Sequence, residues 1–322
     1  MRWRRSSAAS LGALALLACA SGARADLLYV TNQNSSDLSI IDTELGEEVA
    51  RIPVPGNPAG VAASAPLEAV FVVATEGKQL HRFSLTGAMQ GSVDLDGGPI
   101  AVAVDDARGR VFVSDWFNAR IWLIDPEAME VVGDIQTGAA PSGIALSPDG
   151  RFLAVAERDA DRLAIFDAET LATLHRIETG ARPFGVRFAP DGRVVSADVG
   201  SNTVTLADPA SGEVLGSVKT GERPYGVAFS GKNGFVTDQY GDTVTVFDAT
   251  TLIPVGRLDV GEYPEGIDVS TDGQSLFVAN WFSNTITVID ATRGEAMAEI
   301  ETGDGPRAFG QFVVSGSWED LE

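Results

Sequence analysis

The chain is poor in the residues that build most catalytic and metal centres. Its 322 residues include one cysteine, Cys19, and two histidines, His81 and His175. A single cysteine forms no disulfide within the chain, no Cys-x-x-Cys-His haem attachment and no thiolate metal cluster. The histidines fall in different repeats, on strands that we do not expect to meet. The sequence therefore predicts neither a Ser-His-Asp arrangement nor a histidine-rich zinc or copper site.

Basic residues are also scarce. Lysine and arginine together number 23 against 45 acidic residues, which gives a formal net charge of -22 at pH 7. Such a surface repels phosphate groups, so nucleic acid and anionic membrane surfaces are excluded as expected partners. A cationic protein would be attracted to it, although a high charge also serves solubility alone.

Long hydrophobic runs are absent except at the N-terminus. Three arginines within the first five residues precede an apolar run over residues 11–18, and Ala23-Arg24-Ala25 has the small-x-small form of a cleavage site. We therefore predict a signal peptide over residues 1–25, export to the periplasm and no transmembrane segment. Removal of this segment would leave 19 basic against 45 acidic residues.

An alternative to cleavage after Ala25 is lipidation. The sequence Leu16-Leu17-Ala18-Cys19 is similar to a bacterial lipobox, in which the cysteine thiol receives the lipid. In that case the protein would be a lipoprotein anchored through Cys19. Cleavage after Ala25 is the form that we expect.

A proline motif returns along the whole chain. The motif Gly-x-x-Pro-x-Gly, or a close variant of it, recurs at intervals of 40 to 42 residues, with its prolines at Pro58, Pro99, Pro141, Pro183, Pro224, Pro264 and Pro306. A period of this length with four short strands per unit is typical of propeller blades. We therefore predict an all-β, seven-bladed β-propeller with four antiparallel strands per blade.

One repeat shows the unit clearly. Residues 264–303 contain four stretches with alternating apolar residues, and Asp272-Gly273 supplies the tight turn between the first two. No segment has the pattern of a long amphipathic helix. The irregular repeat is the first, where residues 63–84 lack the usual turn and Ser84 replaces the aspartate that closes the third strand elsewhere.

The two ends of the repeat array are complementary. Residues 27–54 supply three strands of a unit, whereas residues 309–314 supply only its first strand. Pairing them would complete the seventh blade and leave no unpaired edge at the seam. We expect a single domain over residues 26–314, a loose tail over residues 315–322 and a monomeric ring.

The tetrapeptide Tyr29-Val30-Thr31-Asn32 carries a family resemblance. Phe277-Val278-Ala279-Asn280 and Phe112-Val113-Ser114-Asp115 are variants of it. The chain resembles the YVTN family of β-propeller repeat proteins over roughly residues 27–314. This resemblance implies a seven-bladed propeller, related to WD40-like repeats, from a secreted, periplasmic or surface protein. It implies no catalytic residues, because many members look like non-catalytic binding modules.

Large aromatic residues gather in the loops that we expect at one mouth of the axial channel. Aromatic side chains bury much area with little loss of conformational freedom, so they suit a binding surface. The alternative is that some of them wedge between blades. The candidates are Trp116, Phe117, Phe184, Tyr225, Tyr240, Tyr263, Trp281 and Phe282.

Three arginines lie next to the repeat prolines: Arg182, Arg223 and Arg307. Their guanidinium groups would hold a small anionic ligand, such as a carboxylate, through paired hydrogen bonds. Pairing with Glu262, Glu265 or Asp304 in a network at the rim is the competing interpretation.

Polar residues end the second strand of several repeats. Oxygen atoms that converge on the axis would bind Ca²⁺, whereas the competing interpretation is that each side chain caps its own loop. Apart from this Ca²⁺ site we expect no cofactor. The five positions are Asn32, Asp115, Asp198, Asp238 and Asn280.

These features favour an exported, non-catalytic binding or scaffolding propeller. Its loop-rich channel mouth would bind a periplasmic protein or a small ligand. Two alternatives stay open because other propellers serve them: an accessory subunit of a periplasmic redox enzyme that uses a quinone cofactor, and a metal-assisted lactonase-like hydrolase. No catalytic residue is predicted.

Overall fold

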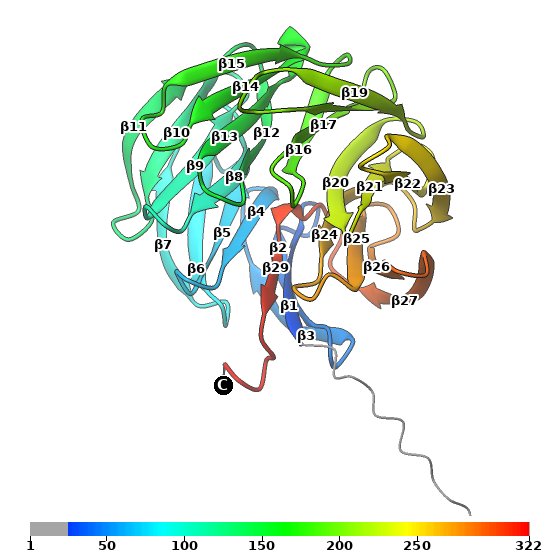
Figure 1. Ribbon diagram of the computed structural model, residues 1–322. Helices are drawn as coiled ribbons and strands as arrows, with labels where there is room; N and C mark the ends of the chain where they lie inside the picture. The colour runs from blue at the N-terminus through cyan, green and yellow to red at the C-terminus, as the bar shows by residue number, and fades with distance from the viewer. Residues whose placement is uncertain (1–24, 322) are drawn as a thin grey trace, which may run out of the picture.

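A computed structural model describes residues 25–321 as a disc of blades arranged around a central axis (Figure 1). There are seven sheets, six of four strands and one of five, as the repeat predicts. The predicted signal peptide and Cys19 lie outside the described residues. Within residues 25–321, no helix has the length and apolarity that crossing a bilayer requires.

Each blade begins at the axis with an inner strand, which is followed outward by a second strand. The inner strands are β4 (Pro58–Ser64), β8 (Pro99–Asp105), β12 (Pro141–Leu146), β16 (Pro183–Phe188), β20 (Pro224–Ser230), β24 (Pro264–Val269) and the pair β28 (Phe309–Gln311) and β29 (Val313–Ser315). The second strands are β5 (Ala69–Ala74), β9 (Arg110–Asp115), β13 (Phe152–Glu157), β17 (Val194–Asp198), β21 (Asn233–Asp238), β25 (Ser275–Asn280) and β1 (Asp26–Asn32).

Two further strands complete each blade toward the rim of the disc. The third strands are β6 (Gln79–Ser84), β10 (Arg120–Asp125), β14 (Arg162–Asp167), β18 (Thr203–Ala207), β22 (Thr243–Asp248), β26 (Thr285–Asp290) and β2 (Asp37–Asp42). The outer strands are β7 (Met89–Asp94), β11 (Glu130–Gln136), β15 (Thr173–Glu178), β19 (Val214–Lys219), β23 (Ile253–Asp259), β27 (Glu295–Glu301) and β3 (Glu47–Pro53). We number the blades from one (β4–β7) to six (β24–β27), and blade seven contains β29, β1, β2 and β3.

Blade seven joins the two ends of the chain. Strand β29 pairs antiparallel with β1, with Leu27 opposite Val314. The preceding β28 pairs in parallel with β4, so that the last inner strand bridges blades seven and one. The predicted closure of the ring is therefore confirmed. Beyond β29, the segment predicted as a loose tail contacts blade seven, where Trp318 and Leu321 pack against the apolar core.

The glycine of the repeated Pro-x-Gly motif permits a close approach between inner strands. A Cβ atom on Gly185 would lie 2.0 Å from the carbonyl oxygen of Tyr225 in the next blade, and one on Gly143 would lie 2.3 Å from that of Phe184. No side chain fits at such distances. The motif thus sets how closely neighbouring blades meet at the axis.

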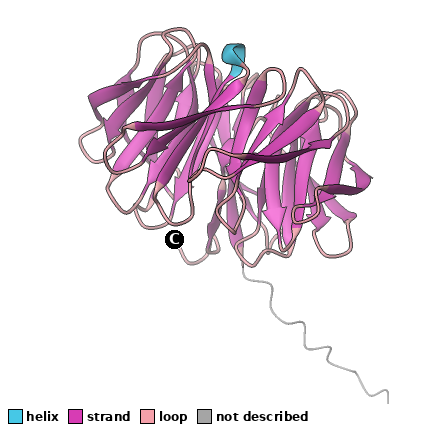
Figure 2. Ribbon diagram, turned by 45° about the horizontal axis from the view of Figure 1, so that its top comes forward, coloured by secondary structure: helices cyan, strands magenta, loops and turns pink. Residues whose placement is uncertain are grey.

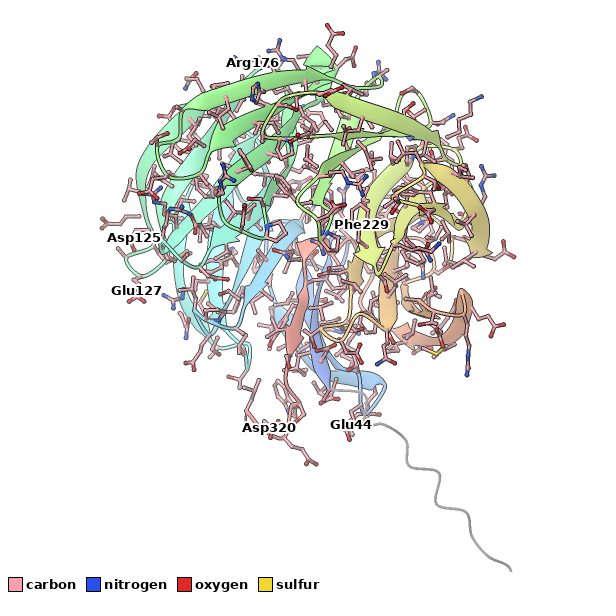
Figure 3. The ribbon with its side chains drawn as sticks, viewed as in Figure 1. Glu44, Asp125, Glu127, Arg176, Phe229 and Asp320 are labelled. Carbon is pink, nitrogen blue, oxygen red and sulfur yellow. The ribbon has the colours of Figure 1, made fainter. Side chains whose placement is uncertain are left out.

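The apolar core lies between blades and within each sheet. Strands β5 and β13, for example, are buried along their whole length, whereas outer strands such as β27 are largely exposed. In Figure 3 the labelled charged residues Asp125, Glu127 and Arg176 lie at the edge of the disc. The connecting loops form two faces (Figure 2), one of which carries the 3₁₀-helix η1 (Arg158–Ala160).

Candidate functional site

The face that carries η1 is the mouth of the axial channel, and hydrogen bonds tie its loops together. In blade five, the N–H of Gln239 donates to the carbonyl of Arg223 at 3.0 Å, and in blade six the N–H of Trp281 donates to that of Tyr263 at 3.0 Å. These bonds hold the residue after the second strand beside the residue before the proline. The side chains at the mouth are therefore presented on fixed backbone.

The residue before the proline is itself held in an unusual conformation. It has a positive φ in six of the seven repeats, with Gly305 in the last and Asn57, Ala140, Arg182, Arg223 and Tyr263 in the others. This left-handed region costs an ordinary residue roughly 1–2 kcal/mol. Because the conformation recurs with unrelated side chains, it is a property of the repeat rather than of one site.

Two repeat positions line the mouth. The first, which we call the inner ring, is the residue after each proline: Ala59, Ile100, Ser142, Phe184, Tyr225, Glu265 and Arg307. The second, which we call the loop ring, is the residue after each second strand: Gln33, Thr75, Trp116, Arg158, Val199, Gln239 and Trp281. All seven loop-ring residues line one of two adjoining depressions.

An aromatic cluster closes the channel beneath these depressions. The rings of Phe184 and Tyr225 stack with centroids 4.2 Å apart, and Phe309 lies 4.9 Å from the first and 5.7 Å from the second. All three side chains are buried. Phe309 also lines a separate axial cavity of about 210 Å³. The cluster thus separates the mouth from this cavity.

The first depression, which we call the apolar lobe, has a volume of about 360 Å³. Its walls are mostly apolar and include Ile100, Trp116 and Phe117, together with Phe184 and Tyr225 of the cluster. Phe117 is 76% exposed. A flat apolar group fits between such rings.

The second depression, which we call the polar lobe, has a volume of about 320 Å³. At its base, Arg307 Nε donates to Glu265 Oε2 at 2.6 Å, and a terminal nitrogen of the same guanidinium donates to the Tyr225 hydroxyl at 2.5 Å. Gln239 Nε2 donates to Glu265 Oε1 at 2.7 Å. Burial raises the pKa of Glu265, and the charge of Arg307 opposes that rise.

Three residues that line the polar lobe each carry a buried polar atom with no hydrogen-bond partner among the described residues. The atoms are Arg223 Nε, Gln239 Oε1 and Trp281 Nε1. All three residues line this lobe, and Gln239 is only 2% exposed. Leaving such an atom unpaired costs about 1–3 kcal/mol. Two donors and one acceptor are therefore left without a partner around this lobe.

The remaining aromatic residues form a rim patch, which consists of Tyr240, Tyr263, Trp281 and Phe282. Tyr263 lies 5.6 Å from Tyr240, 5.4 Å from Trp281 and 4.9 Å from Phe282, measured between ring centroids. Tyr240 and Phe282 are 51% and 61% exposed. A further depression of about 560 Å³ lies against this patch.

Ten of the eleven predicted binding residues line one of these three depressions. Arg182 lines none of the three, and its side chain is exposed. Sequence reasoning missed Phe309, Arg158 and Gln33 as site residues. It named Glu265 only as a partner for an arginine. Counting one position past each proline and each second strand would have found three of these four.

The five candidate metal ligands are engaged inside their own blades. Asp238 accepts hydrogen bonds from Thr243 and Thr245, and Asn280 donates to the equivalent residues Thr285 and Thr287. The others are placed similarly: Asn32 donates to Asp37, Asp115 accepts from Arg120, and Asp198 accepts from Thr205. These contacts favour the capping interpretation, and Ca²⁺ binding stays a prediction.

Two of these carboxyl groups differ in their electrostatics. Burial raises the pKa of Asp198 to about 6, although hydrogen bonds from Thr205, Ser196 and Thr203 oppose the rise. Asp115, which also accepts a hydrogen bond from Arg120, has a pKa below its usual range. Within the described part of the chain, no three His, Cys, Asp or Glu side chains are grouped to hold a metal ion.

The two histidines lie in different blades. His81 is on β6 of blade one and His175 is on β15 of blade three. His81 is buried, which lowers its pKa. The Nε2 atom of His175 is 3.0 Å from the carbonyl oxygen of Ala210, a hydrogen bond with the neighbouring blade.

Comparison with known proteins places the chain among seven-bladed propellers. Residues 118–229 match the family described as Lactonase, 7-bladed beta-propeller. Antigen Lp49 of Leptospira interrogans serogroup Icterohaemorrhagiae serovar copenhageni (strain Fiocruz L1-130) is 26% identical over 151 residues, which are 41% of this chain and 31% of that protein. The chain thus spans less than a third of the curated relative that it matches.

Solved structures share the fold at low identity. Hydrazine synthase of Kuenenia stuttgartiensis is 21% identical, with a TM-score of 0.71 over 83% of this chain and 94% of that chain. A functionally unknown protein from Desulfotomaculum acetoxidans DSM 771 is 16% identical, with a TM-score of 0.75 over 89% and 99%. Dihydro-heme d1 dehydrogenase NirN, in complex with DHE, is 16% identical, with a TM-score of 0.64 over 90% and 75%. At these identities the likeness concerns the fold alone.

Proposed function

We propose that the protein is a non-catalytic binding propeller whose channel mouth holds a small, flat organic anion. The observation that carries this proposal is the set of unpartnered atoms on residues that line the polar lobe: Arg223 Nε, Gln239 Oε1 and Trp281 Nε1. A carboxylate would accept from the two donors, and an O–H or N–H group of the ligand would donate to Gln239. The flat part of the ligand would then lie in the apolar lobe.

Arg223 is the positive group that would attract the anion. Of the arginines that line the polar lobe, Arg307 is paired with Glu265 and Arg158 with Asp159. Among residues 25–321, no ion pair within 4.0 Å includes Arg223. A hydrogen bond between a guanidinium and a carboxylate is worth about 1.5–3 kcal/mol, which is enough to hold a small ligand when ring stacking adds to it.

Calorimetric titration at low salt would test this proposal. The probes are benzoate, indole-3-carboxylate and pyridine-2,6-dicarboxylate, with the corresponding amides as neutral controls. We expect Arg223→Gln to weaken carboxylate binding by about ten-fold or more. Arg182→Gln is the matched control, because Arg182 holds the equivalent position in the preceding blade and lines neither lobe. Equal affinities of the two variants, or no binding by any probe, would overturn the proposal.

Export is part of the same proposal. A periplasmic protein would bind its ligand, or a protein that carries it, outside the cytoplasm. The mass of the protein purified from its native source tests this: a chain that begins at Asp26 supports release into the periplasm, and a diacylated chain that begins at Cys19 supports lipid anchoring. A chain that keeps residues 1–25 contradicts export.

The accessory redox role is a second candidate. Two of the similar structures are described as a hydrazine synthase and a dehydrogenase, and their likeness to this chain supports the role through the fold only. In that role the mouth would face a partner enzyme that carries the quinone cofactor. Copurification of a coloured dehydrogenase with the tagged protein would support this role. Capture at low salt that retains no such enzyme would count against the role.

The hydrolase candidate rests on the family match over residues 118–229. It requires oxygen ligands such as Asp198 and Asp238 to leave their threonine partners and bind a metal ion. Hydrolysis of a panel of lactones, measured with and without added Ca²⁺, tests it. Turnover that Ca²⁺ stimulates and that Asp238→Asn abolishes would favour the enzyme over the binding protein.

A further inference from the structure

The depression against the rim patch is chemically unlike the two lobes of the mouth. We call it the rim pocket, and its volume is about 560 Å³. Three aromatic rings line it, those of Tyr240, Tyr263 and Phe282. Three carboxylates also line it, from Glu222, Asp242 and Glu262, and no basic residue does.

Each ring is tied through the backbone to one of the three acidic residues. The N–H of Tyr240 donates to the carbonyl of Glu222, and the N–H of Phe282 donates to that of Glu262, both at 3.2 Å. The N–H of Tyr263 donates to a carboxylate oxygen of Asp242 at 2.9 Å. Rings and charges are therefore held together by the fold before any ligand arrives, which reduces the entropy cost of binding.

Within the described residues, the negative charges of these three carboxylates are not balanced by ion pairs. All three residues are exposed, and no ion pair within 4.0 Å among residues 25–321 includes any of them. Gln239 lines the polar lobe and the rim pocket alike, and its buried Oε1 has no hydrogen-bond partner among the described residues. A pocket with aromatic walls, three carboxylates and no basic lining residue is suited to a positive ligand.

Tyr240 already makes one such contact. The guanidinium carbon of Arg223 lies 4.5 Å from the centroid of the Tyr240 ring, and one of its nitrogens donates to the Tyr240 hydroxyl at 3.1 Å. Arg223 lines the polar lobe and not the rim pocket. The tyrosine thus separates the positive group of the polar lobe from the negative rim pocket.

From this geometry we propose that the rim pocket is a second binding site and that it takes an organic cation with an alkylammonium or guanidinium head group. The aromatic faces attract the cation, and Glu222, Asp242 and Glu262 neutralise it. The head group has two sources, a free small molecule or a lysine or arginine side chain of a polypeptide. This proposal does not depend on anion binding in the polar lobe.

Proton NMR titration with choline tests the proposal directly. The methyl protons of choline should shift upfield and broaden when they lie over the rings, with a dissociation constant on the order of millimolar at low salt. The neutral isostere 3,3-dimethyl-1-butanol has the same shape without the charge, and it should show neither effect. Equal binding of the two molecules, or no binding of choline, would overturn the proposal.

Three variants test whether choline binds in the rim pocket. Phe282→Leu should weaken choline binding about two- to five-fold, because an exposed cation–π contact is worth about 0.5–1 kcal/mol. Glu262→Gln should weaken binding and reduce its salt dependence. Phe117→Leu is the matched control, since Phe117 is also an exposed phenylalanine, at 76% against 61% for Phe282, but lines the apolar lobe. An equal effect of Phe117→Leu and Phe282→Leu would contradict the assignment.

A comparison of probes identifies the source of the cation. Choline represents a free ammonium compound, and acetyl-argininamide represents a side chain of a polypeptide. Tighter binding of choline supports a small-molecule ligand, and tighter binding of acetyl-argininamide supports a cationic protein partner. Both assignments require that Phe282→Leu lowers the affinity. Unchanged affinities in this variant would overturn the proposal that the rim pocket is the binding site.

Discussion

Arg307 and Glu265 form an ion pair at the channel mouth, with Arg307 Nε 2.6 Å from Glu265 Oε2. They occupy equivalent positions in consecutive repeats, one residue after Pro306 and one after Pro264. Their side chains are 18% and 4% exposed. The repeat has therefore placed opposite charges at adjacent inner-ring positions, where water reaches the pair poorly and each charge depends on the other.

Removing one member of this pair should be costly. Arg307→Met leaves the Glu265 carboxylate buried without its counter-charge, and we expect a loss of about 3–5 kcal/mol in the free energy of unfolding. The double variant Arg307→Met, Glu265→Met should recover most of that loss, because no charge is left buried. Urea unfolding of the single and double variants measures the coupling. A double variant no more stable than Arg307→Met would contradict this account.

Stability should depend on pH through Asp198. Its pKa is about 6 in the folded protein, against about 3.9 in an unfolded chain, because the side chain is buried. The folded state therefore binds more protons between these values, so this contribution to stability is complete below about pH 4 and is lost as pH rises through 6. The change amounts to about 3 kcal/mol.

Asp198→Asn should remove that dependence. Asn280 shows that an amide is accepted at the equivalent position, since it donates to Thr285 and Thr287 where Asp198 accepts from Thr203 and Thr205. Between pH 4.5 and pH 7 the wild type should lose the contribution of Asp198 to the free energy of unfolding. The variant should show no such loss. Urea unfolding at both pH values tests this, and parallel pH profiles for the two proteins would rule out the assignment.

The fold could be predicted from the sequence because the same pattern of strands and turns recurs along the chain. The prolines at intervals of 40 to 42 residues mark every inner strand, and residues 27–54 and 309–314 indicate how the ring closes. The mouth could be predicted only in part. Aromatic residues such as Trp116 and Tyr240 are conspicuous, but the pairing of Arg307 with Glu265 depends on which neighbouring side chain is within reach, and spacing does not encode that.

The direction in which a polar side chain turns was also beyond the sequence. Asp115, Asp238 and Asn280 end second strands as expected. Their spacing was compatible with side chains that point toward a common axis and with side chains that cap their own loops. The structure places hydrogen-bond partners a few residues away in the same blade, such as Thr243 for Asp238. Short-range partners of this kind favour the capping interpretation, and the binding of a shared ion stays a prediction.

The seam of the ring should depend on Asp268. This buried carboxylate pairs with Arg187 of blade four and accepts the N–H groups of Phe312, at 2.9 Å, and Val313, at 3.3 Å. It thereby holds the chain between β28 and β29 in place. Asp268→Ala removes the carboxylate to which Arg187 and three backbone N–H groups donate, including that of Val269, and we expect a loss of at least about 3 kcal/mol.

Hydrogen exchange shows whether that loss is local to the seam. In Asp268→Ala, amides of β29 and β1 should exchange faster than those of β13, on the opposite side of the ring. Thr271→Val is a milder comparison, since it removes only the side-chain hydrogen bond to Asp26. Uniform acceleration in every blade would show that Asp268 supports the whole ring and not its closure.

Two adjacent alanines should respond differently to the same substitution. Ala140 precedes Pro141 with a φ of 53°, whereas Ala139 is not in the left-handed region. Ala140→Gly relieves left-handed strain of about 1–2 kcal/mol, but it also removes a buried methyl group and gives the unfolded chain more freedom. These effects nearly cancel, so we expect the free energy of unfolding to stay close to that of the wild type. Ala139→Gly has no such strain to relieve and should lower the free energy of unfolding by about 0.5–1 kcal/mol. Thermal and urea unfolding of both variants measures the difference. A larger loss in Ala140→Gly than in Ala139→Gly would mean that the repeated left-handed turn carries no strain and that its recurrence at Arg223 and Tyr263 costs the channel mouth nothing.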